Sequence, residues 1–430
     1  MRIAIIKIIL ITYLAMIFDI FYPNGSLLKI TNMNIKKILP IFFIIIFLSC
    51  GKKRIASSVE AIERANIEVK THIMHMNDME VDSFPLSKLI CDIRYIQLET
   101  TTDACLTMPT NVKMNKNFIY VSDNDEHLLC FDRNGKFIRK PFRNGRGKGE
   151  IIRMYDFDID DKYLYVLDGA LSSIVKFDHE GNYKETKKLP FRAIRFLHSK
   201  NGFIFQLAPY SLEGKDNDVL VTTTDENFNV QGKYFNYMNN ATPTTRTPCF
   251  VNGQYGVVYA PIFCRSIYTL NDSNKLSMSF YYEFNSPYYE QSKDVEGIKE
   301  SVDNDIFYTY ENALQSRDYT VQNFVISKEK QGFFIANNKS LNGMFIRKIT
   351  QDSNIVYDFN FSNTKFYDCK TDIFVGFVYK YYEGVHDEKI THIRAQLNDS
   401  VATKIIRGKE VEPFSENPLI ILYRLCEDII

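Results

Sequence analysis

The chain of 430 residues has no Trp and no pair of cysteines separated by two residues. Without a C-x-x-C pair, a structural zinc site with the usual cysteine spacing is not expected. The linear catalytic motifs Gly-x-Ser-x-Gly and His-Glu-x-x-His are missing, as is a Gly-x-Gly-x-x-Gly that opens a helix. The 52 basic and 52 acidic residues cancel, so no long-range attraction to nucleic acid is indicated.

Helical periodicity is also scarce outside the N-terminus and one later segment, which favours an all-β protein. With 45% hydrophobic residues, including 27 Tyr and 33 Phe, the chain has ample material for a core.

A repeat in the sequence indicates the architecture. Tyr120–Asp123 followed by Phe131–Phe137 returns about 45 residues later as Tyr165–Asp168 followed by Phe177–Tyr183. Two apolar strands joined by a turn with Gly, recurring every 40 to 50 residues, are typical of a propeller blade. The sequence therefore predicts a single six-bladed β-propeller of four-stranded antiparallel blades over residues 84–430.

An aromatic and β-branched triplet marks the expected second strand of each blade. The six copies begin at Ile119, Leu164, Ile204, Val257, Phe333 and Phe374. The step from Val258 to Phe334, 76 residues, is longer than the others. Its polar segment has Val295, Ile298 and Val302 at helical spacing, so we predict a short helical insertion at about 289–318, between blades 4 and 5.

The two ends of this region supply strand-like runs that would close the ring. Pro418–Leu425 and Ile93–Leu98 are both apolar and extended in pattern. We expect them to share the last blade, which would leave no open sheet edge at the seam.

The N-terminus resembles a bacterial lipoprotein signal. Residues 33–49 have a short basic region and an apolar run, and Leu48-Ser49-Cys50-Gly51 resembles a lipobox. That resemblance implies cleavage before Cys50 and attachment of lipid there, with the membrane as a partner. The alternative is an uncleaved anchor. Residues 1–32 are interpreted as an over-extended start, or else as a further transmembrane segment, and residues 50–83 as a polar tether.

Cysteine pairing stays open at this point. Once Cys50 is set aside, seven cysteines remain, so at least one has no intramolecular partner. A Cys91–Cys105 disulfide is one alternative, and burial as small apolar side chains is the favoured one for most.

Several segments together resemble a known family. Phe131–Phe137, Gly145–Glu150, Ile96–Thr100 and Asn417-Pro418 look like the six-bladed β-propeller lipoproteins of Bacteroidetes, which are related in shape to NHL-repeat propellers. The resemblance spans about 84–428 and departs at Lys148, where the family commonly has Pro. It implies the fold and a cell-envelope location, here the outer membrane of a Gram-negative bacterium, and it implies no established activity.

Two candidate ligand sites follow from the residues. Gly145–Gly149 with Arg143, Arg146 and Lys148 could bind an anion through backbone N–H groups and side-chain charge, although blade connections need Gly for geometry alone. Asp156 and Asp158 alternate with apolar residues, which predicts an innermost strand with a solvated face or, less favoured, a cation beside the channel.

A third candidate precedes the propeller. His72, His75 and Met76 are soft ligands that could hold a metal such as Cu(I), although this segment lies in the predicted tether. No cofactor is expected.

The leading hypothesis is a lipid-anchored envelope propeller that binds a ligand or protein, without catalysis. The alternatives are a hydrolase or lyase acting on a peptide or glycan at the channel mouth, and a scaffold in an envelope complex. An enzyme would be favoured by several acids and a His meeting at one end of the channel.

Overall fold

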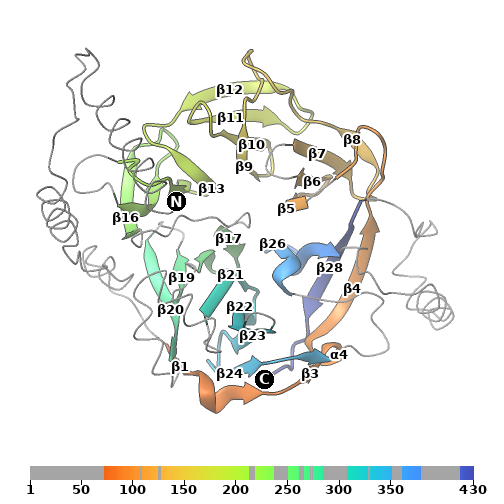
Figure 1. The fold of residues 1–430 in the computed structure, drawn as a ribbon, viewed down its shortest axis with the longest axis vertical. Helices are drawn as coiled ribbons and strands as arrows, with labels where there is room; N and C mark the ends of the chain where they lie inside the picture. The colour runs from red at the N-terminus through yellow and green to blue at the C-terminus, as the bar shows by residue number, and fades with distance from the viewer. Residues whose placement is uncertain are drawn as a thin grey trace, which may run out of the picture. The chain divides into compact units, whose positions relative to one another are not determined.

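The computed structural model describes residues 72–106, 109–123, 127–212, 218–236, 250–260, 266–271, 273, 275–283, 308–327, 330–350, 361–378 and 417–430. These residues form six antiparallel four-stranded units that stand radially in a ring (Figure 1). The only α-helix among these residues is α4, Leu86–Leu89. They also include two 3-10 turns, η1 (Met76–Met79) and η3 (Phe361–Asn363). The prediction of an all-β six-bladed propeller is confirmed.

Blades 1 to 3 use consecutive strands. Blade 1 has β5 (Pro109–Met114), β6 (Phe118–Asp123), β7 (His127–Asp132) and β8 (Phe137–Arg139). Blade 2 has β9 (Met154–Ile159), β10 (Tyr163–Asp168), β11 (Ser173–Asp178) and β12 (Tyr183–Lys188). Blade 3 has β13 (Ala193–Ser199), β14 (Gly202–Leu207), β15 (Val219–Thr224) and β16 (Val230–Asn236).

Blades 4 to 6 complete the ring. Blade 4 has β17 (Phe250–Gly253), β18 (Gly256–Tyr259), β19 (Ser266–Leu270) and β20 (Leu276–Glu283). Blade 5 has β21 (Tyr308–Gln315), β22 (Tyr319–Ser327), β23 (Lys330–Asn337) and β24 (Gly343–Ile346), and blade 6 has β26 (Thr364–Asp368), β27 (Ile373–Val378), β28 (Leu419–Leu425) and β4 (Ile90–Gln97). The four strands of each blade are called A to D in this order.

The middle strands are buried along almost their whole length. All residues of β10 after Tyr163 are buried, and so is every residue of β14. Each blade is covered on both faces by its neighbours, so a middle strand has no solvent side. This explains why the repeat shows aromatic and β-branched triplets rather than strict alternation. The outer strand β12, with sequence YKETKK, alternates because one of its faces is exposed.

The ring is closed as predicted. Leu419 to Leu425 of β28 pair antiparallel with Gln97 to Ile90 of β4, so the two ends of the propeller share blade 6. A disulfide joins Cys91 in β4 to Cys426, which directly follows β28. The alternative Cys91–Cys105 pairing is therefore wrong, because the strand pairing brings the C-terminal cysteine beside Cys91.

The N-terminal segment contributes strands of its own. β1 (Ile73–His75) pairs in parallel with β20, β2 (Glu80–Val81) with β24, and β3 (Phe84–Pro85) with β25 (Ile349–Thr350). The predicted tether therefore ends sooner than residue 83, since its last part covers the outer edges of blades 4 and 5. Residues 1–71, with the predicted signal and Cys50, lie outside the described residues.

The predicted helical insertion needs one correction. Its range ends inside blade 5, because Tyr308–Gln315 form strand β21 and not a helix. Val295, Ile298 and Val302, which carry the helical spacing, lie outside the described residues. The marker triplet at Phe333 falls on β23, the third strand of its blade, and this shift accounts for part of the long step before it.

The C-to-D turns use one recurring device. The carboxylate of Asp132 accepts the N–H groups of Asn134 and Lys136, and that of Asp178 accepts those of Glu180 and Asn182. In blade 3 the side chain of Asp225 accepts the N–H groups of Asn227 and Asn229. In blade 4 the side-chain oxygen of Asn271 accepts those of Ser273 and Lys275. These Asx turns need a residue with positive φ, and Gly135 and Gly181 supply it at +84° and +88°.

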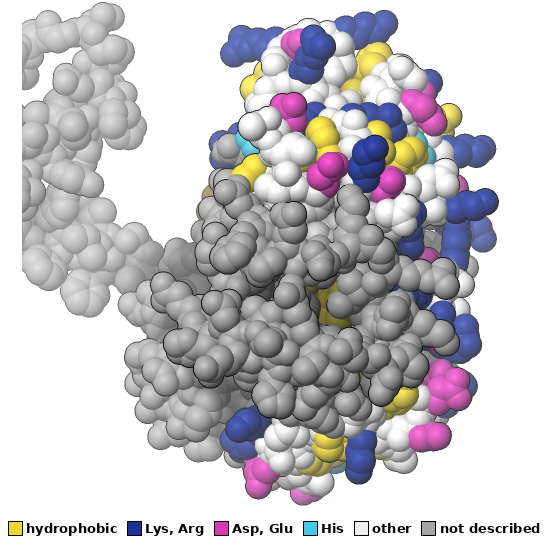
Figure 2. Space-filling model, turned by 90° about the vertical axis from the view of Figure 1, so that its right-hand side faces the viewer, with side chains coloured by type: hydrophobic (Ala, Val, Ile, Leu, Met, Phe, Trp, Pro, Cys, Tyr) yellow, Lys and Arg dark blue, Asp and Glu magenta, His cyan; other side chains and the backbone are white. Residues whose placement is uncertain are grey.

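The described surface is mixed in character. Seen from the side, Lys and Arg side chains alternate with Asp and Glu, and hydrophobic side chains occur singly or in small groups (Figure 2). Among the described residues, no helix is long and apolar enough to cross a membrane.

Candidate functional site

The A strands lie nearest the channel, and the A strands of neighbouring blades contact one another (Figure 1). The turn that follows each A strand therefore lies at the mouth of the channel. These six A-to-B turns are residues 115–117, 160–162, 200–201, 254–255, 316–318 and 369–372, and all are described. We call them together the mouth ring.

Direct contacts join the turns of blades 4, 5, 6 and 2. The hydroxyl of Tyr255 donates to the carbonyl of Arg317 at 2.8 Å, and the Arg317 N–H lies 3.4 Å from Asp372 Oδ1. Lys370 Nζ lies 2.6 Å from Asp161 Oδ1 and 2.8 Å from Oδ2, which links blade 6 to blade 2. These four turns of the mouth ring therefore form one continuous surface and not separate loops.

A buried histidine joins blades 1 and 2 beneath this surface. His179 Nε2 lies 3.0 Å from both Asn115 Nδ2 and the carbonyl of Asp160, and Nδ1 lies 3.0 Å from the hydroxyl of Tyr120. Arg139 donates to the His179 carbonyl at 2.8 Å. The sequence placed His179 in a hairpin turn, which is correct, but this side chain is only 8% exposed. Burial raises the pKa of Tyr120 far above its usual value.

Asp156 and Asp158 lie on the innermost strand β9, as predicted. The prediction that their face of the strand is solvated is wrong, because both side chains are buried. Asp158 is 1% exposed and lies 2.6 Å from Lys113 Nζ on β5. Its other oxygen accepts the N–H of His198 on β13 at 2.7 Å. Asp156 accepts the N–H of Phe196, which also belongs to β13, at 3.0 Å. Asp158 therefore joins the innermost strands of blades 1, 2 and 3, and Asp156 joins those of blades 2 and 3.

A second cluster at the end of β13 was missed by the sequence. His198 Nε2 lies 2.9 Å from Glu226 Oε1, and Nδ1 lies 3.6 Å from Asp160 Oδ2. Tyr165 donates its hydroxyl to Asp160 at 2.8 Å, and burial with this hydrogen bond raises the Tyr165 pKa far above its usual value. These residues come from two blades and four separate elements, so no linear motif signals them.

The Arg143–Lys148 loop lies elsewhere. It belongs to the connection from β8 to β9, at the opposite end of β9 from Asp160. Arg143, Arg146 and Lys148 are exposed, but Glu150 accepts the N–H of Gly147 at 2.7 Å. The protein's own carboxylate thus occupies part of the proposed anion cradle, and anion binding by this loop stays a prediction.

The proposed metal ligands lie at the outer edge of blade 4. His75 belongs to β1, and the ring of His72 lies 6.1 Å from that of Phe280. The side chain of Met76 lies outside what the structure describes. Among the described residues, no group of three or more His, Cys, Asp or Glu side chains has the arrangement of a metal site.

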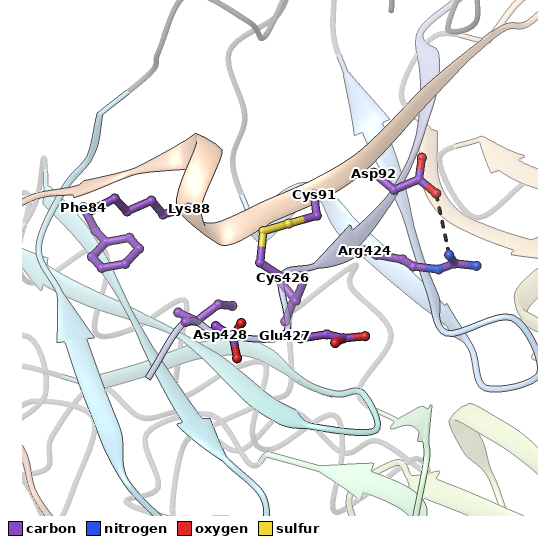
Figure 3. Close-up of a pocket in the computed structure, with 10 residues that line it drawn as sticks. Phe84, Lys88, Cys91, Asp92, Arg424, Cys426, Glu427 and Asp428 are labelled. Atoms are coloured by element: carbon purple, nitrogen blue, oxygen red, sulfur yellow. Dashed lines mark ion pairs between the residues drawn. A yellow bond between two sulfur atoms is a disulfide. The ribbon is translucent and has the colours of Figure 1, made fainter.

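A cavity of about 770 Å³ lies at the closing seam. Figure 3 shows the Cys91–Cys426 disulfide between the Asp92–Arg424 ion pair and the side chains of Phe84 and Lys88. Glu427 and Asp428 complete its charged lining. Arg424 donates to the carbonyl of Thr371 at 3.0 Å, so this seam pocket lies on the same face of the ring as the mouth ring.

Comparison with known proteins agrees with this fold. A solved structure of a protein from Bacteroides fragilis, described as exported, has a TM-score of 0.60 at 14% identity and covers 84% of this chain and 100% of that chain. A member of the duf4221 family from Bacteroides vulgatus has a TM-score of 0.44 at 9% identity, covering 79% and 97%. BamB from Moraxella catarrhalis has a TM-score of 0.36 at 9% identity, covering 58% and 67%. At 14% identity the likeness to the Bacteroides fragilis protein shows the fold alone.

No curated protein matches the sequence at a significant level. Residues 66–424 match a family described as Domain of unknown function (DUF4934), a span that includes the whole ring up to the last residues of β28. A match over this share of the chain shows that the protein belongs to the DUF4934 family.

Proposed function

We propose that this protein is an exported propeller of the cell envelope that binds a partner through the mouth ring. The observation that carries the proposal is the continuity of that surface, in which contacts between turns of four blades hold exposed side chains in fixed positions. Loops held by a rigid ring are a common form of binding surface, because little conformational entropy is lost on association.

The covalent chemistry supports export. A disulfide between Cys91 and Cys426 requires an oxidising compartment, such as the periplasm or the cell exterior. Attachment of lipid to Cys50 would keep the ring at a membrane. Metabolic labelling with an alkyne fatty acid tests this part, since label should enter the native chain and be lost in Cys50→Ala.

The binding face is tested by crosslinking in the native envelope. A photoreactive amino acid at Tyr255, which is 50% exposed in the mouth ring, should give an adduct of defined mass. The matched control is Tyr210, which is 76% exposed and lies in a B-to-C connection, at the opposite end of its strands. Adducts at position 210 and none at 255 would contradict the proposal.

A hydrolase or lyase is the second candidate, and one observation favours it. His198 lies between the carboxylates of Asp160 and Glu226, a combination that suits proton transfer, near one end of the channel. Turnover of envelope peptides or glycans by the native protein that is lost in His198→Asn would establish catalysis. The scaffold hypothesis rests on the segment around Val295 and Ile298 and stays a prediction.

A further inference from the structure

We propose that the mouth ring binds an acidic segment of a protein partner, an inference that rests on the proposed binding function. One exposed cation follows the A strand in five of the six blades, with Tyr255 in blade 4 as the exception. These cations are Lys116, Lys162, Lys200, Arg317 and Lys370.

Four of the five cations are free to meet a ligand. Lys370 pairs with Asp161, whereas the side chains of Lys116, Lys162, Lys200 and Arg317 form no ion pair with any other described residue.

The acids of the same turns are already engaged by the protein. Asp160 accepts the hydroxyl of Tyr165, Asp372 accepts the hydroxyl of Tyr367 at 2.6 Å, and Asp318 pairs with Lys339 at 2.9 Å. In the neighbouring C-to-D turns, Glu226 is held by His198, and Glu180 is exposed. The six turns of the mouth ring carry these five cations and four acids, Asp160, Asp161, Asp318 and Asp372, so their formal net charge is +1, whereas the chain as a whole has zero net charge.

The contacts of the turns place the four cations around one opening. Lys162 directly follows Asp161, which Lys370 bridges to blade 6, and blade 6 contacts the turn of Arg317. Lys116 follows Asn115, which shares the imidazole of His179 with Asp160. Lys200 follows β13, whose His198 lies 3.6 Å from that same Asp160. A ligand at the mouth would thus meet several cations at once.

The aromatic at the sixth position favours a protein over a simple ion. Tyr255 is half-exposed, and its hydroxyl is fixed by the carbonyl of Arg317. Tyr and Arg side by side are the residue types that contribute most to protein–protein association. The seam pocket does not extend this region, because it has the three carboxylates Asp92, Glu427 and Asp428 beside two cations.

The test is binding of a fluorescent twelve-residue oligoglutamate to the full-length protein, followed by anisotropy, with oligolysine as the control probe. Oligoglutamate should bind saturably, and the variant with Lys116, Lys162, Lys200 and Arg317 all changed to Ser should bind at least about tenfold more weakly. Raising NaCl from 0.05 to 0.5 M should weaken binding by the native protein, since the cations are exposed.

The matched control changes four other exposed cations to Ser, which lie in or next to the connections between blades at the opposite face: Lys140, Arg153, Lys188 and Arg192. This variant should keep its affinity within about twofold. Equal loss in both variants, or none in the mouth variant, would overturn the inference. Tighter mouth-dependent binding of a sulfated glycan than of oligoglutamate would also overturn it, since the partner would then be a glycan. If oligoglutamate does not bind while Tyr255 still crosslinks a partner, the binding face stands and the acidic chemistry is wrong.

Discussion

Cys91 in β4 and Cys426, directly after β28, are 335 residues apart in the chain, yet their Cα atoms lie 5.0 Å apart beside the ladder that closes the ring. The disulfide and the β4–β28 ladder therefore secure the same seam. Because the bond closes a very long loop, its removal should free much entropy in the unfolded chain.

We expect the double variant Cys91→Ser with Cys426→Ser to lose about 2–5 kcal/mol of unfolding free energy. Denaturant unfolding measures this loss. The control is Cys369→Ser, which removes an exposed thiol that forms no disulfide. If the unfolding free energy of the double variant equals that of the native protein, the β4–β28 ladder alone closes the ring.

Deleting residues from Pro418 onward should destabilise the protein sharply. The deletion removes β28, which lies between β27 and β4, and so leaves β4 without a partner strand in blade 6. It also removes the buried side chains of Leu419 to Tyr423 from the core. The thermal midpoint of the truncated chain measures the effect, and an unchanged midpoint would contradict ring closure by the C-terminal strand.

The buried Lys113–Asp158 pair should be essential to the interface of blades 1 and 2. Lys113→Met leaves a buried carboxylate without its cation, so we expect a loss of about 3 kcal/mol in unfolding free energy. Lys116→Met, at the exposed end of the same hairpin, should change it by less than about 0.5 kcal/mol. Equal effects in the two variants would mean that the buried pair does not hold the blades together.

Two glycines with similar positive φ, Gly135 and Gly181, should respond differently to substitution by Ala. At Gly181 a new Cβ would lie 3.4 Å from its nearest neighbour, so only the backbone strain of about 1 kcal/mol is expected. At Gly135 the Cβ would overlap the carbonyl of Gln97, which adds a steric cost. Chemical unfolding of both variants should rank Gly135→Ala as the more destabilised, and the reverse order would refute this account.

The C-to-D turn of blade 2, at Asp178, should make the stability of the protein depend on pH in the acid range. Burial opposes ionisation of Asp178, but hydrogen bonds from Lys184 and Asn182 outweigh it and hold the pKa at about 2. The folded pKa is below the unfolded value near 3.8, so this stabilisation is present above about pH 4 and lost as the pH falls toward 2. The difference in Tm between the native protein and Asp178→Asn should therefore narrow over that range. If the difference in Tm stays constant over this range, the Asp178 carboxylate is not the source of the stabilisation.

Much of the architecture follows from local pattern. The recurrence of Phe131–Phe137 as Phe177–Tyr183 depends on an Asx turn and a left-handed glycine, both of which act within a few residues. In the C-to-D turn of blade 3 the residue with positive φ is Phe228, at +66°, whose buried ring packs on Phe203 and Phe205. Packing there replaces glycine, which explains why the repeat weakens after the second blade.

The sequence by itself determined the blade count, the closing strands and the chemistry of the first turns, because strand period and turn residues are local properties. Only the tertiary structure decided the partner of Cys91, the burial of Asp158 beside Lys113, and the gathering of cations from five blades at the mouth. These relationships join residues that lie far apart in the chain, and the positions of such residues are set by the pairing and radial packing of whole sheets rather than by any spacing along the chain.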